Sequence, residues 1–327
     1  MTPESVPAAG GAIHTMSDMA QRARQRDKRF RWLVLGMALL VLVVLGAIMT
    51  TLLAGAAPVF EKFGLGFLTG SDWNPVTDEF GALPAIYGTL VTSIIALLLA
   101  VPVSFFIAFF LTTLCPHRLR APINGVIELL AGIPSIIYGM WGLFVLAPLL
   151  AEHVQPLLNE WFGGIWLLGA IFQGPPIGIG MLPAAIILAI MITPFITAIM
   201  REVFEVVPQG LKEAGYGLGA TTWEVMWDIV LPYTRVAVMG GIMLGLGRAL
   251  GETMAVTFMI GNSNNITAGL FNAGNSIASV IANEFAEASS DMHVSALIAL
   301  GFVLFVIAFG VLAVARLMIL HVERRQS

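Results

Sequence analysis

The sequence is short of the charged residues with which a soluble protein covers its surface. Only 11% of its 327 residues are charged, whereas 58% are hydrophobic, and the mean hydropathy is +0.90. A chain with so little polar surface cannot enclose a core in water, so a soluble globular protein is excluded and a membrane protein is expected. The net charge of -4 gives no reason to expect a nucleic-acid partner.

Cysteine and lysine are also scarce. The single cysteine, Cys115, cannot form a disulfide within the chain, and its place before Pro116-His117-Arg118 indicates a packing residue rather than a reactive thiol. The only lysines are Lys28, Lys62 and Lys212, and none follows glycine as the phosphate-binding Walker A loop requires. The chain therefore carries no Walker A loop of its own, and we assign it no catalytic or metal-ligating residue.

Apolar runs long enough to cross about 30 Å of hydrocarbon dominate the sequence. They predict an all-α, polytopic membrane protein with six transmembrane helices near residues 33–54, 84–114, 123–150, 182–200, 236–260 and 294–319. The first run is too long for the apolar part of a signal peptide, so we expect an uncleaved first span. A seventh piece, Ile165–Phe172, is too short to span and runs into Gly174-Pro175-Pro176, which predicts an interfacial or re-entrant segment.

Lysine and arginine accumulate on one side of the predicted membrane. Thirteen of the 16 lie in residues 22–31, in the loops at 115–122 and 201–235, or after residue 320. Of the other three, Arg248 and Arg316 fall inside spans, and only Lys62 lies in an outer loop. Because positively charged loops stay in the cytoplasm, both termini and the 201–235 loop are predicted to be cytoplasmic. We expect residues 1–31 to form a tail without ordered structure.

The predicted loop at residues 201–235 is too long for a simple turn and has a helical pattern of its own. Pro208 is suited to open a first helix that Gly217 and Gly219 end, and Thr221-Thr222 is suited to cap a second. The second helix would carry an apolar stripe at i, i+3, i+4 and i+7, formed by Trp223, Met226, Trp227 and Val230. We therefore expect two short helices at the membrane surface.

This loop resembles the EAA loop of ABC importer permeases. The similar residues are Glu213-Ala214-Gly215, then Gly219 after three residues, then Ile229-Val230-Leu231-Pro232 after nine more. Gly215 stands where that pattern usually has alanine. The resemblance implies that the loop docks into a cleft of a separate ATPase subunit, with Glu213 and Gly219 nearest the contact and the other matched residues completing the coupling motif. The alternative is an amphipathic surface helix with accidental spacing.

Two ionisable residues lie within the fifth predicted span. Arg248 and Glu252 are four residues apart, which predicts that they share one face of one helix. Because exposing either group to lipid costs about 3 kcal/mol or more, we expect them to face the substrate pathway. The alternative is a structural ion pair that fixes helix packing. Nearby small residues would let another helix approach closely, and they are Gly241, Gly245, Gly247 and Gly251.

The chemistry of this pair indicates a cargo. A guanidinium offers a planar donor fork suited to an oxyanion, whereas a nearby carboxylate repels an anion unless that anion carries a proton to donate. Phosphate keeps a proton near neutral pH and sulfate does not. Our hypothesis is therefore that Arg248 and Glu252 accept hydrogen phosphate and disfavour sulfate.

Other polar residues in the spans leave more than one interpretation open. Glu128, near the cytoplasmic end of the third predicted span, would join the Arg248 network, pair with another arginine, or lie at the interface as a snorkelling carboxylate. Tyr138, Thr193 and Thr197 would line a polar path or form hydrogen bonds between helices.

Three further segments resemble the PstC-type permeases of phosphate importers: Gly88–Ala108, Glu128–Gly142, and the GRALGETMAV sequence that begins at Gly247. The resemblance covers residues 84–320. Residues 1–31, 32–83, the outer loops and the 321–327 tail have no matching motif and no transferred role. It implies the type I architecture of ABC importer permeases, alternating access in a bacterial inner membrane, and a match of Arg248 and Glu252 to the family's charged pathway positions. It also implies partners: a second, PstA-like permease, two copies of an ATPase that bind ATP and Mg, and an extracytoplasmic phosphate-binding protein.

Three alternatives remain at this point. The first is a permease for another oxyanion, such as sulfate or molybdate. The second is an ion-coupled secondary transporter, which would normally show internal repeats and would not need an EAA loop. The third is a membrane enzyme that uses Glu252 as an acid or base, although no second carboxylate, histidine or nucleophile lies nearby in the same span.

Overall fold

The computed structural model describes residues 10–324. The chain divides into two units, Met1–Ala54 and Gly55–Ser327. Helix α1 (Gly10–Phe63) crosses this division. Its backbone is already helical at residues 10–31, where the sequence led us to expect a tail without ordered structure. Residues 1–9 and 325–327 lie outside the described residues.

The prediction of an all-α protein with six spans is confirmed. Among the described residues, six helical segments are long and apolar enough to cross a membrane: Asp27–Phe63, Leu83–Leu114, Ser135–Phe162, Met181–Glu205, Thr222–Leu250 and Asp291–Leu317. Four of these match the predicted runs closely. The third and fifth differ, and both differences bear on function.

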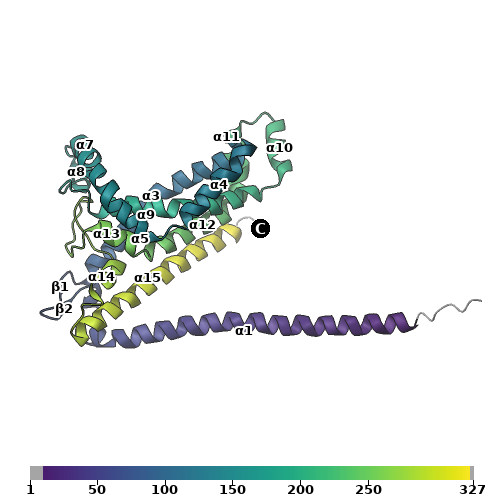
Figure 1. The fold of residues 1–327 in the computed structure, drawn as a ribbon, viewed down its shortest axis with the longest axis horizontal. Coiled ribbons are helices and arrows are strands. Elements are labelled where there is room, and N and C mark those ends of the chain that lie inside the picture. The colour runs from purple at the N-terminus through teal and green to yellow at the C-terminus, as the bar shows by residue number, and fades with distance from the viewer. Residues whose placement is uncertain (1–9, 325–327) are drawn as a thin grey trace, which may run out of the picture. The chain divides into compact units, whose positions relative to one another are not determined.

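The second unit is built around α9 (Met181–Glu205), which packs on α3 (Leu83–Phe109) and on α12 (Leu231–Leu250) (Figure 1). Because α9 is apolar on nearly every face, it is suited to the centre of a helical bundle. Small buried side chains such as Ala184 and Ala189 let α3 approach it closely. The hydroxyl of Ser104 in α3 donates to the Thr193 carbonyl at 3.1 Å and joins the two helices.

The third predicted span, residues 123–150, was wrong in its position. The structure has a separate helix, α4 (His117–Ala131), that ends before Pro134, and the span itself begins with α5 (Ser135–Trp141). Proline has no backbone N–H and disfavours a helical conformation in the preceding residue, so the chain breaks here rather than only kinking. The span continues through α6 (Ala147–Leu149) to α7 (Gln155–Phe162).

Short π-turns widen the helices just before prolines. All four end two residues before a proline: Phe110–Leu114 before Pro116, Gly142–Leu146 before Pro148, Leu150–Val154 before Pro156, and Val225–Val230 before Pro232. Each proline leaves the carbonyl four residues earlier without its usual donor, and a wider turn accommodates that carbonyl and the proline ring. The first of these, Phe110–Leu114, extends α3.

The fifth predicted span, residues 236–260, was also misplaced. Its helix starts earlier, with α11 (Thr222–Glu224), and continues through a π-turn into α12. It stops at Leu250, and a separate short helix, α13 (Met254–Ile260), follows after three residues. The residues predicted as the second surface helix of the loop are therefore the first turns of this span.

The remaining elements lie at the end of the second unit opposite α10 (Gln209–Gly217) and α11 (Figure 1). The short apolar piece near Ile165–Phe172 forms α8 (Trp166–Ile171), which is too short to span, as predicted. The others are α2 (Gly66–Thr69), an antiparallel pair β1 (Trp73–Asn74) and β2 (Glu79–Phe80), α14 (Ile277–Glu284) and the start of α15 (Asp291–Arg324).

Candidate functional site

The loop at 201–235 folds around α10, which begins directly after Pro208 and ends at Gly217, as the sequence predicted. Gly219 has a φ of +87°, a left-handed conformation that L side chains rarely adopt, and open space surrounds the position of its missing side chain. Glycine is therefore needed for the backbone turn, and the exposed surface beside it is free for a partner.

The two halves of the EAA-like motif contact each other. Gly215 is buried, and a Cβ placed on it would lie 2.5 Å from Cδ1 of Ile229 and 3.1 Å from Cγ2 of Val225. Packing of Gly215 inward turns its neighbours Glu213 and Ala214 outward, and both are exposed. The motif thus has an internal face that holds α10 on the bundle and an outer face that presents the glutamate.

Lys212 attaches α10 to the end of α9. Its ammonium group donates a hydrogen bond to the carbonyl of Phe204 at 3.1 Å. Burial lowers the pKa of Lys212, and the nearby carboxylate of Glu205 opposes that shift. This contact gives the short helix a second attachment besides the Gly215 packing.

The start of the fifth span is fixed by a cap and by aromatic packing. Thr221 forms a capping box with Glu224: its backbone N–H donates to Oε2 at 2.7 Å, and its Oγ1 accepts from the Glu224 N–H. Trp223 and Trp227 stack with ring centroids 5.6 Å apart and pack on phenylalanines at the end of α3. The predicted stripe therefore packs on the bundle and does not form an independent surface helix.

The structure contradicts the prediction that Arg248 and Glu252 share one face of one helix. Helix α12 ends at Leu250, so Arg248 lies in its last turn and Glu252 in the break before α13. Glu252 Oε1 accepts a hydrogen bond from the backbone N–H of Ala255 at 3.4 Å. Glycine at 251 has low helix propensity, and the Glu252 side chain caps the following helix instead of continuing α12. Spacing alone did not reveal this break.

Arg248 and Glu252 are not an ion pair in this structure. The two carboxylates that the sequence suggested as partners of Arg248 have other contacts: Glu128 pairs with Arg201, and Glu252 accepts from the Ala255 N–H. Arg248 is exposed on the chain, with its guanidinium carbon 6.0 Å from the ring centroid of Phe195. The two residues remain only four positions apart, so the break leaves both an unpaired guanidinium and a half-buried carboxylate in one short region.

The position of Phe195 locates Arg248 along the bundle. Phe195 lies within α9, about 21 Å from Met181 and about 15 Å from Glu205 at the usual helical rise of about 1.5 Å per residue. Arg248 is therefore level with the interior of a membrane-spanning helix rather than with either end. A permanently charged group at that depth requires polar surroundings.

The glycines of α12 serve packing within the chain. A Cβ on Gly241 would meet Ile199 at 2.7 Å, and one on Gly245 would meet Ile196 at 2.7 Å, so both lie against α9. Gly247 faces Leu312 of α15. The expected close helix approach is present within the chain, against both α9 and α15.

Two of the open interpretations are now decided by contacts. Glu128 pairs with Arg201 at 3.7 Å and so links α4 to α9. Tyr138 donates a hydrogen bond to the Leu130 carbonyl at 2.8 Å, across the break between α4 and α5. Thr193 bonds within its own helix, to the Ala189 carbonyl. Thr197 has a buried hydroxyl without a partner in the described part of the chain.

The sequence analysis missed one residue of the loop, Leu218. It is 90% exposed, beside the Gly219 turn and next to the exposed Tyr216. An apolar residue between two glycines in a polar loop was the available signal, because such a side chain has no core to enter. Its exposure adds an apolar contact to the outward face that carries Glu213.

Comparison with known proteins finds a matching family and several relatives. Residues 100–326 match the family of binding-protein-dependent transport system inner membrane components. The chain is 58% identical over 288 residues to the phosphate transport system permease protein PstC of Mesorhizobium japonicum, with 88% of each chain covered. It is 56% identical to that of Pasteurella multocida over 89% of this chain and 90% of the relative. It is 40% identical to a probable PstC of Methanocaldococcus jannaschii over 78% and 82%.

A solved structure supports the fold. An inward-facing form of the MetNI methionine ABC transporter aligns with 73% of this chain and 94% of its own, with a TM-score of 0.53. The sequence identity is 15%, so this likeness concerns the arrangement of helices alone.

Proposed function

The chain belongs to the family of binding-protein-dependent transport system inner membrane components, and from that premise we propose that it is a phosphate permease subunit of an ATP-driven importer. The names of the relatives support phosphate as the cargo. The observation that carries the mechanism is the position of Arg248: a permanent cation, unpaired with a carboxylate and exposed at mid-membrane depth. Such a group needs either a water-filled pathway or an anion.

The pathway would lie on the surface of the second unit that Arg248 faces, opposite a second permease subunit. The guanidinium would hold phosphate through charge-assisted hydrogen bonds. The nearby carboxylate of Glu252 would accept a hydrogen bond from the protonated oxygen of hydrogen phosphate. The break after α12 supports this role, because it frees Glu252 from a helical ion pair with Arg248. Alternating access would then expose this region to one side of the membrane at a time.

ATP would be bound and hydrolysed, with Mg, on a partner ATPase dimer. We propose that α10 docks into that ATPase through Glu213, Ala214, Leu218 and the Gly219 turn, which together form the exposed face of the loop. Gly215, Ile229, Leu231 and Pro232 would transmit the movement, since Gly215 packs on Ile229 and the latter residues lead directly into α12. Beyond the Gly219 turn, one continuous helical segment from Thr222 leads to Arg248.

The remaining assignments follow from charge distribution and family. We propose that both termini and α10 face the cytoplasm of a bacterial cell, because lysine and arginine concentrate on that side. The permease domain would comprise residues 84–320. The opposite end, with α8, β1, β2 and α14, would face an extracytoplasmic phosphate-binding protein.

The test is phosphate uptake by proteoliposomes that contain the complete complex, with ATP inside and the binding protein outside. We expect Arg248→Gln to lower uptake by about tenfold or more, because a charge-assisted contact to the cargo is lost. The matched control is Arg316→Gln, which removes the other arginine within a span. Full uptake by the Arg248 variant, or equal losses in both variants, would refute the pathway assignment.

A further inference from the structure

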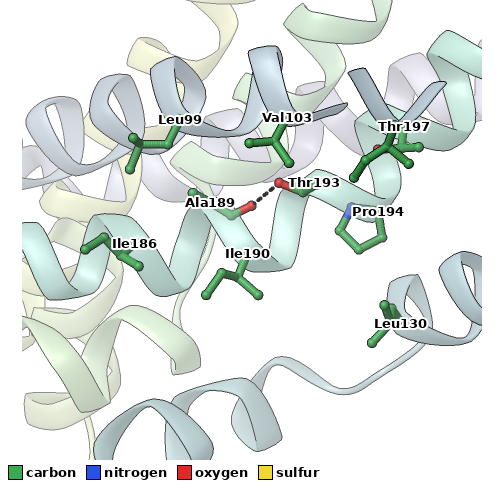
Figure 2. Close-up of a pocket in the computed structure, with 10 residues that line it drawn as sticks. Leu99, Val103, Leu130, Ile186, Ala189, Ile190, Thr193, Pro194 and Thr197 are labelled. Atoms are coloured by element: carbon green, nitrogen blue, oxygen red, sulfur yellow. Dashed lines mark hydrogen bonds between the residues drawn. The ribbon is translucent and has the colours of Figure 1, made fainter. Parts of the chain in front are cut away.

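An apolar groove of about 360 Å³ lies on the second unit between α3, α4 and α9 (Figure 2). Its walls include Val103 of α3, Leu130 of α4 and Ile190 of α9, and each of these side chains is exposed on the chain. Apart from two threonines, the lining is hydrocarbon. The groove is therefore suited to an apolar occupant.

Polar side chains lie at one end of the groove. Thr193, Thr197 and Arg201 follow one another at intervals of four residues on α9, so they lie along one face of that helix. Thr193 donates to the Ala189 carbonyl at 2.7 Å, as the dashed line in Figure 2 shows. Thr197 Oγ1 and Arg201 Nε are buried and have no hydrogen-bond partner in the described structure. Thr197 lines this end of the groove and Arg201 lies one helical turn beyond the lining, so these two donors indicate a ligand with an acceptor at one end.

The seam between α4 and α9, beside Arg201, contains further polar groups without a hydrogen-bond partner. On α4, Arg120 and Asn124 precede Glu128 at four-residue intervals, and Arg120 Nε and Asn124 Oδ1 are also buried without a partner. Glu128 approaches Arg201 from the exposed side, at 3.7 Å from Nη2, and does not reach Nε. Because buried polar groups normally have partners, this seam is expected to be completed by something outside the chain.

The length of the groove matches one leaflet of a bilayer. From Ile186 to Thr197, α9 rises about 16 Å at its usual pitch. This is close to half of the roughly 30 Å hydrocarbon thickness. Arg201 then follows where the apolar run of α9 ends, at the depth of lipid headgroups.

We propose that this groove binds an anionic phospholipid, with one acyl chain along α9 and its phosphodiester at Thr197 and Arg201. A phosphodiester supplies only acceptor oxygens, which suits the unpaired donors. Arg120 of α4 adds a buried basic group on the same seam. Free phosphate would gain nothing from the hydrocarbon walls, so a lipid is the better fit. The site depends on the membrane setting and not on the identity of the cargo.

For the test, the complete complex is released from nanodiscs that contain phosphatidylglycerol and phosphatidylcholine. Native mass spectrometry then measures how much phosphatidylglycerol the complex retains. Arg201→Gln removes the charge, Thr197→Val removes the hydroxyl at nearly constant volume, and Ile190→Trp fills the groove from its exposed side. We expect each to lower the retained phosphatidylglycerol, by about fivefold for Arg201→Gln. Arg118→Gln, an exposed arginine at the same end, should change retention by less than about twofold.

Several outcomes would overturn the proposal. One is a wild-type complex that retains no phosphatidylglycerol, which is expected if a helix of the second permease fills the groove. Another is an equal loss in the Arg118 and Arg201 variants, which would indicate surface attraction alone. A third is equal retention of phosphatidylcholine and phosphatidylglycerol, because the headgroup charge would then not matter. Arg201→Lys provides a folding control that keeps the charge but lacks Nε.

Discussion

Gly215 of α10 lies directly against Ile229 at the start of the fifth span. A Cβ on Gly215 would be 2.5 Å from Cδ1 of Ile229, closer than real side-chain atoms pack. The two residues belong to opposite ends of the EAA-like motif, so this contact joins α10 to the span that leads to Arg248. It also accounts for the glycine that stands where the resembling loops usually have alanine.

The first prediction concerns this contact. Gly215→Ala should destabilise the loop, because overpacking costs about 1–3 kcal/mol and outweighs the gain of about 0.5–1 kcal/mol from better helix propensity. In an Ile229→Val background the obstructing Cδ1 is absent, so the same change should become neutral or stabilising. Thermal unfolding of the purified complex measures both steps, and the same sign in both backgrounds would contradict the packing argument.

The second prediction concerns the outward face of α10. Glu213→Lys should abolish co-purification of the ATPase and ATP-driven uptake, because it reverses a charge on the exposed docking face. Leu218→Ser should weaken the complex less, by loss of one apolar contact. The control is Glu202→Lys, which reverses an exposed carboxylate at the end of α9 outside the motif. An intact complex with unchanged uptake in the Glu213 variant would rule out this docking face.

The number and class of the spans followed from hydropathy, because a bilayer requires long apolar helices. The two misplaced spans have a common physical reason. Hydropathy is equally high on both sides of the breaks before Pro134 and at Gly251, so apolar content does not show where the backbone leaves the helix. At Pro134, nothing in the sequence distinguishes a kink from a complete break.

The candidate site was only partly predictable for a similar reason. Arg248 and the EAA-like residues stand out by charge and spacing. The absence of an Arg248–Glu252 pair depends on the helix end at Leu250, and the inward packing of Gly215 depends on a contact with a residue 14 positions away. Such contacts belong to tertiary structure, which spacing along one helix does not reveal.

The third prediction concerns the break between α4 and α5. Tyr138→Phe removes the hydrogen bond to the Leu130 carbonyl and keeps the ring packing, so it should cost about 1 kcal/mol. We expect the unfolding temperature of the complex to fall by about 2 °C. Tyr233→Phe, at an exposed position, is the matched control and should leave it unchanged. Equal unfolding temperatures for both variants would show that the hydrogen bond does not stabilise this junction.

The fourth prediction concerns cargo selectivity at Glu252. Glutamine keeps an oxygen that can accept from the Ala255 N–H, so Glu252→Gln should preserve the start of α13 while it removes the negative charge. Without that carboxylate, hydrogen phosphate loses an acceptor for its proton, and the repulsion of sulfate is relieved. We therefore expect weaker phosphate binding together with stronger displacement by sulfate.

The measurement uses radiolabelled phosphate bound to the purified complex without the binding protein, so that only the selectivity of the permease is observed. Glu128→Gln is the control, since that carboxylate pairs with Arg201 on α9 and should not affect the choice of anion. If the Glu252 variant binds phosphate as tightly as the wild type and still excludes sulfate, Glu252 does not select the protonated anion. Selection would then have to come from Arg248 and the second permease subunit.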